Sequence, residues 1–450
     1  MFKKFPGYLF FLFILLFLIG IILFSNTVKY YLEGGKRFVI LKSIVFYIIE
    51  IPRPIINMVK SKSLNPNKPP IFTKHKNKKK FEQYIEKKRN ALLVLPRYDH
   101  SQSKSIVEIV DLNNFEVLHI YQHDISEMNN QVKNVSEFSK LKISDSPTRF
   151  EYRHPLILAD GSLVSDSDYA IEFKIDFCSN LLWINDQEEF HHSKMLDSQG
   201  NIWVPGQMKP QSTKYVAKYS MKDFKDDSII KINSDGKILF NKSVTEILIE
   251  NKIFPDNFAI NSYLSGEKDP IHLNYIEPAL TNTDYWKQGD LFLSLRHQSS
   301  IVHYRPSTNK IINYLTGPFS QQHDVDIISD KEISIFNNNN FVIDNKYSEV
   351  IIYDFELNKF KKLFNDKFQK ENIKTVTQGS SHIFRDGALM VEEQNHGRLI
   401  LFNNKGEKEW EFVNKDKNGN IGFLSWSRVI EDEKFIKEYK LLVEDKKCPN

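Results

Sequence analysis

The chain has 450 residues, of which 41% are hydrophobic and 26% charged, as in an ordinary globular protein of one large or two smaller domains. The formal net charge is only +4, and no basic stripe extends beyond the run Lys74–Lys80, which argues against a nucleic-acid partner. The aromatic share of 13%, with 34 Phe and 19 Tyr, favours sheet faces over long polar helices.

The first predicted element is an apolar run, Gly7–Phe24, that carries no charge. At about 1.5 Å per residue it nearly spans a hydrocarbon core of ~30 Å, so a transmembrane helix is expected over residues 7–24. Because Lys3 and Lys4 precede it, residues 1–6 should be cytoplasmic and the rest exported. A cleaved signal peptide is the alternative, but no A-x-A site follows. We therefore predict a single-pass inner-membrane anchor, with the following domain facing the periplasm.

A second apolar stretch covers residues 38–51, but Lys42 interrupts it and Glu50 lies near its end. Because it is too short and too charged to span a membrane, we predict an amphipathic helix that lies in the interface. Pro52 and Pro54 end this helix. If the stretch did span, the following domain would face the cytoplasm instead.

A linker is predicted over residues 52–90, in which Lys, Asn and Pro are frequent. The run Lys74–Lys80 inside it is either a solvated stretch or a weak attraction to anionic lipid headgroups. A short helix is predicted at its end, over Phe81–Asn90.

From residue 91 onwards, short β-rich runs replace helical patterns. One run leads into a turn of the Asp-Gly type, a second run follows, and several of these units begin with a histidine. The units lie at His154–Val164, His192–Trp203, His323–Ser334 and His382–Met390. Such repeats predict an all-β fold, a β-propeller over residues 91–450. Blades of about 40–60 residues predict six, or seven as the alternative number, and two β-sandwiches are the alternative fold.

Five of the 13 histidines begin a predicted inner strand. They are His154, His192, His272, His323 and His382. The innermost strands of a propeller line its channel and begin at one mouth, so these side chains should converge on the axis. A metal site is one interpretation, because imidazole is a common metal ligand. An anion-handling site is the other, and Arg296 and Arg428 favour it because a planar guanidinium suits an oxyanion.

The two cysteines are expected to be free thiols. Cys178 lies in an apolar run and Cys448 lies close to the end of the chain. There is no CxxC pair, so neither a zinc ribbon nor a thioredoxin-like motif is present.

Several short strings, in order, carry a resemblance to a known family. They are His272-x-Asn274, Ser294-x-Arg296, and Gln322-His323-Asp324 followed by Phe336-Asn-Asn338. Together with His191-His192 before a Gly turn and Ser427-Arg428 near the end, this order resembles the bacterial arylsulfotransferase (aryl-sulfate sulfotransferase) family. The resemblance runs from about residue 153 to 433. Where the family usually has Asp in the last string, this chain has Asn337.

The resemblance implies a six-bladed propeller that is exported to the periplasm. It implies transfer of a sulfuryl group from an aryl sulfate donor to a phenolic acceptor, with no nucleotide donor, no cofactor and no metal. His323 matches the family's nucleophile and would be sulfated transiently. The other site residues implied are His192 (with His191 as the alternative), His272 and Arg296 for the sulfuryl oxygens and proton transfer, Asn274 to orient His272, and Arg428 to bind substrate.

These residue types suit that chemistry. Neutral imidazole is a competent nucleophile at neutral pH. A transferring sulfuryl group spreads negative charge over its oxygens, so cationic and N–H donors stabilise it, and a covalent intermediate predicts ping-pong kinetics. Two other classes stay open: a non-catalytic membrane-anchored propeller that binds a glycan or an envelope protein, and a metal- or quinone-dependent propeller enzyme. The quinone class usually needs more tryptophan than the five present here.

Overall fold

The computed structural model describes residues 7–32, 72–133, 150–167, 169–209, 212, 225–253, 269–340 and 347–448. The chain divides into two compact units, Met1–Lys68 and Pro69–Asn450. The predicted interfacial helix at 38–51 lies outside the described residues, as does the predicted linker up to residue 71.

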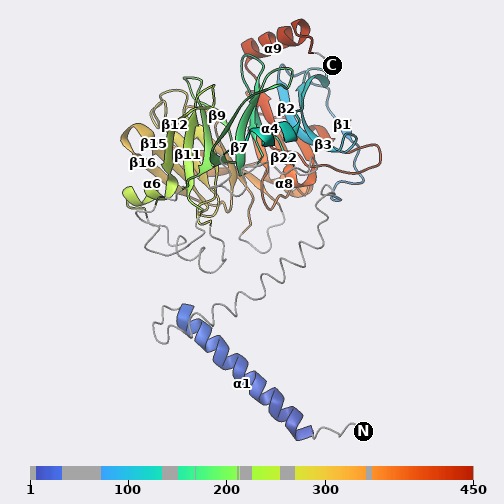
Figure 1. Cartoon of the computed structure of the whole chain (residues 1–450). Coiled ribbons are helices and arrows are strands. Elements are labelled where there is room, and N and C mark those ends of the chain that lie inside the picture. The colour runs from blue at the N-terminus through green and yellow to red at the C-terminus, as the bar shows by residue number, and fades with distance from the viewer. Residues whose placement is uncertain are drawn as a thin grey trace. The chain divides into compact units, whose positions relative to one another are not determined.

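The first unit contains helix α1, Gly7–Leu32, which includes the apolar run (Figure 1). The helix continues beyond Phe24 through Ser25, Asn26 and Thr27, and the Thr27 hydroxyl donates to the Leu23 carbonyl one turn back, at 2.8 Å. No helix in the described part of the chain is long and apolar enough to cross a membrane. The structure therefore does not confirm the predicted transmembrane helix at 7–24.

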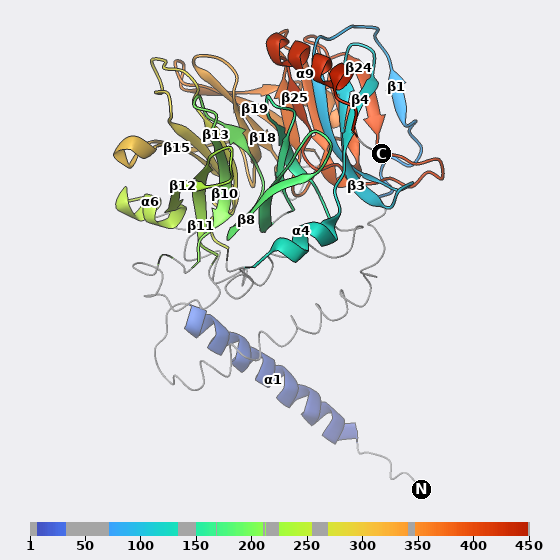
Figure 2. The same cartoon turned by 45° about the horizontal axis from the view of Figure 1, so that its top comes forward.

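The second unit is mainly β, and the strands in its described residues form five antiparallel sheets in a β-propeller arrangement (Figures 1 and 2). One sheet has the order β25 (Arg428–Ile430), β2 (Leu92–Asp99), β3 (Lys104–Asp111) and β4 (Glu116–Tyr121). The next, with eight strands, contains β5 (Arg153–Ile157), β6 (Leu163–Asp166), β7 (Ala170–Ile175), β8 (Leu181–Phe190), β9 (Met195–Leu196), β10 (Ile202–Gln207), β11 (Asp227–Ile232) and β12 (Ile238–Ser243).

The remaining sheets follow in chain order. The third contains β13 (Leu273–Pro278), β14 (Leu291–Leu295), β15 (Ser300–Arg305) and β16 (Lys310–Thr316). The fourth contains β17 (His323–Ile327), β18 (Glu332–Asn337), β19 (Glu349–Asp354) and β20 (Lys359–Leu363). The fifth contains β21 (Ser380–Ile383), β22 (Leu389–Glu393), β23 (Arg398–Phe402), β24 (Lys408–Val413) and, at its edge, β1 (Phe81–Gln83).

Short helices fill the connections. They are α4 (Ile125–Gln131), α6 (Val244–Glu250), α8 (Asn365–Lys370), α9 (Glu433–Asp445) and the 3-10 turns η2 (Pro306–Thr308) and η3 (Gln394–His396).

The predicted Asp-Gly type turns recur between strands for a local reason. The side chain of Asn233, in the second sheet, accepts the backbone N–H groups of Asp235 and Lys237. That of Asn403, in the fifth sheet, does the same for Lys405 and Glu407. Such side-chain acceptors stabilise tight turns. Glycine closes each turn at positive φ, 78° at Gly236 and 74° at Gly406, where a side chain would be strained.

The hydrophobic core lies between successive sheets. One cluster joins Phe336 and Val350 of the fourth sheet to Leu389 and Ile400 of the fifth. Another joins the fifth sheet to the first, with Leu401 packed in the same group as Leu93 of β2. Since each fully buried apolar side chain contributes about 1.5–3 kcal/mol, packing of sheet against sheet is a main source of stability. The last sheet thus packs on the first, as a closed ring requires.

Strand pairing also closes the ring. β25, near the end of the chain, pairs with β2, near the start of the unit, through Arg428↔Val94 and Ile430↔Leu92. Residues 72–90 belong to this unit as well. Phe81–Gln83 forms β1 against β24, so the predicted helix at Phe81–Asn90 is wrong. The cause is tertiary: the Phe81 ring packs on Phe115, with centroids 4.7 Å apart.

The expectation of two free thiols is also wrong, because Cys178 and Cys448 form a disulfide. Helix α9 lies beside β4 (Figure 2), and the Tyr439 hydroxyl meets that of Tyr121 at 2.9 Å. This docking carries the end of the chain back to the β7–β8 turn. A bond between cysteines 270 residues apart has no local sequence signal.

Candidate active site

The residues that lead into the inner strands share an uncommon backbone conformation. His154, His192, His272, Asp324 and Trp426 have φ of 41°, 66°, 52°, 48° and 64°. Outside glycine, positive φ costs of the order of 1–3 kcal/mol and is concentrated at functional sites. Pairing is irregular next to this position in β5, β13 and β17. A bulge of this kind re-aims side chains, and the same device recurs from sheet to sheet.

Three of the five predicted histidines come together, and the Trp426 ring contacts two of them. The His192 ring lies 5.2 Å from that of His272 and 6.4 Å from that of His323. The Trp426 ring lies 5.5 Å from His192 and 6.0 Å from His323. We call His192, His272 and His323 the histidine cluster. Its members come from the starts of three inner strands, as the repeat pattern predicts.

The other two histidines lie apart from this cluster. The His154 ring lies 5.6 Å from that of Trp426, but among the described residues no ring contact joins it to the other histidines, and its Nδ1 accepts the backbone N–H of Lys194 at 3.3 Å. His382 pairs with Glu431, with 3.1 Å between Nε2 and Oε1. The predicted convergence therefore holds for three strands and not for all five.

His323 is held in one tautomer by Asn338. Its Nδ1 lies 2.6 Å from Asn338 Oδ1. The Asn338 amide nitrogen donates to Thr375 Oγ1 at 2.9 Å and to the Gln378 carbonyl at 2.7 Å, so its oxygen must face His323. Asn338 Oδ1 can only accept, so Nδ1 of His323 carries the proton and Nε2 carries the lone pair. Nε2 accepts the backbone N–H of Gln378 at 3.2 Å.

Electrostatics keep that imidazole neutral. His323 is 1% exposed, and burial holds the pKa of its ring well below the ordinary value, with the nearby Arg296 guanidinium acting in the same direction. A neutral ring with a defined lone pair at Nε2 is the form that a nucleophile requires.

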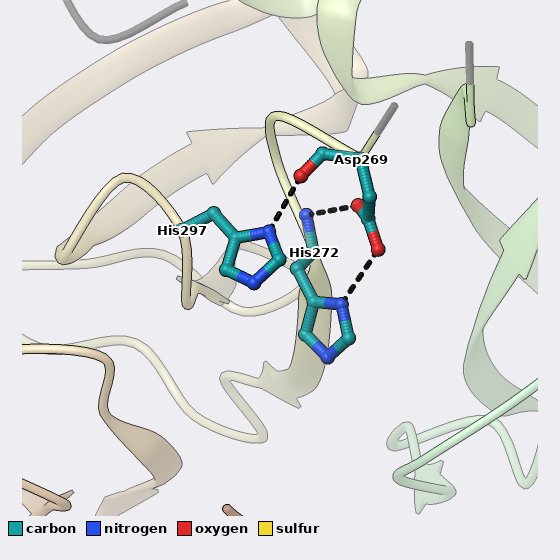
Figure 3. Close-up of side chains that lie close together, drawn as sticks. All are labelled: Asp269, His272 and His297. Carbon is teal, nitrogen blue, oxygen red and sulfur yellow. Dashed lines mark hydrogen bonds and ion pairs between the residues drawn. The ribbon is translucent and has the colours of Figure 1, made fainter. Parts of the chain in front are cut away.

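Asp269 orients His272, as Figure 3 shows. Its Oδ2 accepts from His272 Nδ1 at 2.7 Å, and its Oδ1 accepts the His272 backbone N–H at 3.0 Å. Burial would raise the pKa of Asp269, but the His272 and His297 rings and Lys225 outweigh it, and the pKa lies below its usual range. An ionised carboxylate bonded to Nδ1 leaves Nε2 of His272 as the position for proton exchange.

His297 completes the group drawn in Figure 3. Its Nδ1 lies 2.5 Å from the Asp269 carbonyl oxygen, and its ring lies 4.6 Å from that of His272. Asp269, His272 and His297 have ligand atoms within 4.8 Å of one another, so this is the place to test the metal interpretation.

The contacts of His297 argue against a cation there. With Nδ1 directed at a carbonyl, only Nε2 could bind a metal, and Arg296 Nη1 lies 2.6 Å from Nε2. A guanidinium in that position donates to the nitrogen lone pair and repels a cation. The arrangement suits a hydrogen-bond network around an anion better than a metal centre.

Arg296 faces the site from the end of β14. Besides its contact with His297, its Nη2 donates to Gln321 Oε1 at 3.3 Å, and the same oxygen accepts from Asn340 at 3.0 Å. The side chain is 9% exposed. A nearly buried guanidinium with polar supports is a preorganised donor for an oxyanion.

His192, and not His191, belongs to the cluster. His191 lies behind it, with its Nδ1 2.7 Å from Nδ1 of His192 and its ring stacked on Tyr169 at 4.5 Å. Burial lowers the pKa of both rings well below the ordinary value. His191 therefore supports His192, which faces His272 and His323.

Two predicted binding residues are placed differently from expectation. Asn274 donates to the Gln322 carbonyl at 2.9 Å, while Asp269 takes the orienting bond to His272. The Oδ1 of Asn274 has no hydrogen-bond partner within the described residues, although its side chain is buried. Asn274 therefore lies beside His323 with an acceptor unused.

Arg428 does not join the histidine cluster. It donates to the carbonyls of Lys194 at 2.6 Å and Pro155 at 3.2 Å, and it lines a cavity together with Glu277 and Asp326. The predicted role of Arg428 in substrate binding stays a prediction, and these contacts already use most of its donors. Asn337 is likewise structural: its Oδ1 accepts the backbone N–H groups of Ser320 and Asn339.

Asp269, Asn338 and Trp426 are the site residues that the sequence did not suggest. Asn338 has a usable signal, because it occupies the last position of the string that matches the family. Asp269 and Trp426 have no sequence signal of their own. Each only lies close in the chain to a residue that the sequence did suggest, Asp269 three residues before His272 and Trp426 just before Ser427.

Comparison with known proteins gives the family of this fold and site. The sequence model of the family described as "Arylsulfotransferase (ASST)" matches residues 154–415, which include the whole histidine cluster, Asn274 and Arg296. The chain belongs to the arylsulfotransferase family. Membership indicates an aryl-sulfate sulfotransferase acting on aryl sulfates. No curated protein matches the chain.

The solved structures to which this arylsulfotransferase family member is similar share little sequence with it. A protein of unknown function from Bacteroides caccae is 11% identical, with a TM-score of 0.47, over 76% of this chain and 100% of that chain. Virginiamycin B lyase from Staphylococcus aureus is 12% identical, with a TM-score of 0.33, over 58% of this chain and 69% of that chain. A chain of a nidogen–laminin complex is 7% identical, with a TM-score of 0.41, over 76% of this chain and 99% of that chain.

Proposed function

We propose that the protein transfers a sulfuryl group from an aryl sulfate ester to a phenolic acceptor through a sulfated His323, without a nucleotide donor. The observation that carries this proposal is the Asn338–His323 pair, with 2.6 Å between Oδ1 and Nδ1, which leaves a buried neutral imidazole with its lone pair at Nε2. Family membership supports the reaction class.

In the first step, His323 Nε2 attacks sulfur, and an S–N bond forms while the bond from sulfur to the aryl oxygen breaks. The aryl oxide leaves with the electron pair and takes a proton from the His272 imidazolium. In the second step, the acceptor phenol gives its proton back to His272 and attacks the same sulfur, and the S–N bond breaks. The Asp269 carboxylate at 2.7 Å stabilises the imidazolium form of His272 between these steps.

Arg296 and His192 supply donors for the three sulfuryl oxygens. The backbone N–H of Gln378, now 3.2 Å from Nε2, must leave the lone pair when sulfur binds, and it then can donate to a sulfuryl oxygen. The unused acceptor of Asn274, which lies beside His323, can hold the hydroxyl of an incoming phenol.

We also propose six blades, counting β5–β8 and β9–β12 of the eight-stranded sheet as two four-stranded blades. An extracytoplasmic location remains our proposal. The Cys178–Cys448 disulfide supports it, because disulfides persist in oxidising compartments. Nucleotide sulfate donors are absent from such a compartment, so ester exchange would suit it.

The test uses the full-length protein in a non-ionic detergent, with 4-nitrophenyl sulfate as donor and phenol as acceptor, and follows release of nitrophenol. We expect turnover that His323→Ala reduces by at least about 10³-fold, because the covalent route is lost. His382→Ala is the matched control, since His382 also lies on an inner strand, β21, but outside the cluster, and it should keep activity within about twofold. Full activity in His323→Ala would overturn the nucleophile, and no release with any phenol tried would favour the binding propeller.

A further inference from the structure

A cavity runs along the inner strands of the propeller. It has a volume of about 630 Å³. The histidine cluster lies where β13 and β17 begin and just before β9, whereas this cavity is lined by residues along these strands, from Met195 and Asp324 to Glu277 and Ile327, and by the turns after β17 and β21. We call it the acidic cavity. None of His192, His272 and His323 lines it.

Three carboxyl groups of the inner strands line the acidic cavity: the buried Glu277 and Asp324, and the half-buried Asp326. Two are fixed by neighbours. Asp324 Oδ2 accepts the backbone N–H of Ser381 at 2.7 Å, and Asp326 Oδ1 accepts the Tyr275 hydroxyl at 3.3 Å. Asp324 follows His323 directly, but its positive φ of 48° and the irregular pairing there direct the two side chains to different sites.

Glu277 is the least compensated of the three. It is 9% exposed, and its Oε2 has no hydrogen-bond partner within the described residues. Burial raises the pKa of Glu277, and the neighbouring Asp326 and Asp324 raise it further. A buried carboxyl oxygen without a donor destabilises the folded protein, and a bound donor would remove that cost.

Basic side chains share the acidic cavity, because Arg385 and His382 line it as well. Arg428 also lines the acidic cavity, but its donors go to the carbonyls of Pro155 and Lys194 and to Met195 Sδ. Arg428 therefore adds positive charge to the cavity, but its hydrogen bonds go to groups other than Glu277. Burial disfavours the ionised form of these carboxyl groups, so a cation that enters and pairs with them would keep them ionised.

The lining identifies the kind of cation. Apolar side chains form much of the wall, including Ile327, Ile352, Leu363, Ile383 and Phe384. A cavity of this size with apolar walls and a few fixed polar groups is typical of an organic ligand. Among the described residues, the group of His, Cys, Asp and Glu gathered tightly enough for one metal ion is Asp269, His272 and His297, and it includes none of the three carboxyls.

We propose that the acidic cavity binds an organic ammonium ion with an apolar body, its N–H groups donating to Glu277 and Asp326 and its apolar part packing against the isoleucines. This site is separate from the sulfuryl-transfer site and does not depend on it.

The test titrates the full-length protein in non-ionic detergent with benzylamine and phenethylamine, followed by saturation-transfer NMR and by Tm. We expect saturable binding and a rise in Tm with both amines. Benzyl alcohol, which has the same body without the charge, should bind at least about tenfold more weakly. Calcium chloride serves as the metal probe and should not displace the amines.

Carboxylate-to-amide variants locate the site. Glu277→Gln and Asp326→Asn should each weaken amine binding by about tenfold or more. Glu356→Gln makes the same chemical change on an exposed side chain and should leave it unchanged. Nitrophenol release should stay at the wild-type level in Glu277→Gln, which separates this proposal from the transfer mechanism. Equal binding of benzyl alcohol, wild-type affinity in both cavity variants, no saturable amine binding, or displacement by calcium would each overturn it.

Discussion

At the scale of single residues, each imidazole of the proposed mechanism is defined by one polar partner. Asn338 fixes the tautomer of His323, and Asp269 fixes that of His272. The first leaves a neutral nucleophile, and the second provides a proton donor and acceptor backed by a carboxylate. The ring centroids of His272 and His323 both lie within 6.4 Å of that of His192. Because their polar partners differ, the two histidines can carry different roles in one site.

Asp269→Asn should reduce turnover in a way that depends on the leaving group. Without the carboxylate, the His272 imidazolium is less stable and protonates the leaving aryl oxide poorly. We expect a loss of about 10²-fold with phenyl sulfate and only a few-fold with 4-nitrophenyl sulfate, whose oxide leaves without help. The measurement is kcat against leaving-group pKa for both proteins.

A merely structural role for Asp269 would lower kcat equally for every donor, which would contradict its proposed effect on His272. Asp269→Glu, which keeps the charge, should restore part of the loss with phenyl sulfate. Because the pKa of Asp269 lies below its usual range, the carboxylate is ionised at every pH near neutrality, so its effect should not itself vary with pH there.

At the scale of elements, the site depends on how the inner strands begin. The sequence pattern of strand-initial histidines predicted this place, and the structure brings three of them together. It could not predict the backbone: positive φ at His192, His272 and Trp426 follows from the packed surroundings, not from residue type. The packed surroundings also decide where Arg428 lies. It follows Ser427, as in the family string, but it lines the acidic cavity.

Glu392 fixes the backbone just before β25. Its two carboxyl oxygens accept the backbone N–H groups of Trp426 at 2.9 Å and Ser427 at 2.7 Å, and it is fully buried. Glu392→Ala leaves both donors without a partner and should cost about 2–5 kcal/mol in the free energy of unfolding. Glu392→Gln keeps one acceptor and should cost less.

Glu392 also predicts how the stability of the protein depends on pH. Burial raises the pKa of Glu392 from 4.5 to about 7. Stability linked to it is therefore fully present below pH 4.5 and is lost as the pH rises through about 7. The glutamine does not titrate, so the stability gap between wild type and Glu392→Gln should narrow from about pH 5 to 8. Urea unfolding at each pH measures it, and a constant gap would contradict the assignment.

At the scale of the whole molecule, two distant closures complete the propeller. β25 pairs with β2, and the disulfide ties Cys448 to the turn that holds Cys178. The alternation and turn pattern predicted the all-β repeat, because both signals are local. The edge strand β1, the docking of α9 and the disulfide depend on contacts between chain ends, and no local pattern predicts them.

Removing the disulfide should lower stability and leave catalysis intact. A cross-link over a long loop restricts the unfolded chain, so the Cys178→Ser/Cys448→Ser protein should lose about 2–5 kcal/mol. Thermal unfolding with and without dithiothreitol measures the effect. The double variant is the control, because its Tm should not respond to the reductant. A wild-type Tm that is equally insensitive would show that the bond does not stabilise the fold.

The most direct test of the central proposal is to look for the sulfated histidine. The full-length protein is mixed with 4-nitrophenyl sulfate in the absence of any acceptor, quenched at alkaline pH to preserve an N-sulfated imidazole, and analysed by peptide mass spectrometry. The mechanism predicts a burst of about one nitrophenol per protein and one sulfuryl group on the peptide that contains His323, released again on addition of phenol. Multiple turnover with no sulfated peptide, or a sulfuryl group carried by another residue, would contradict it.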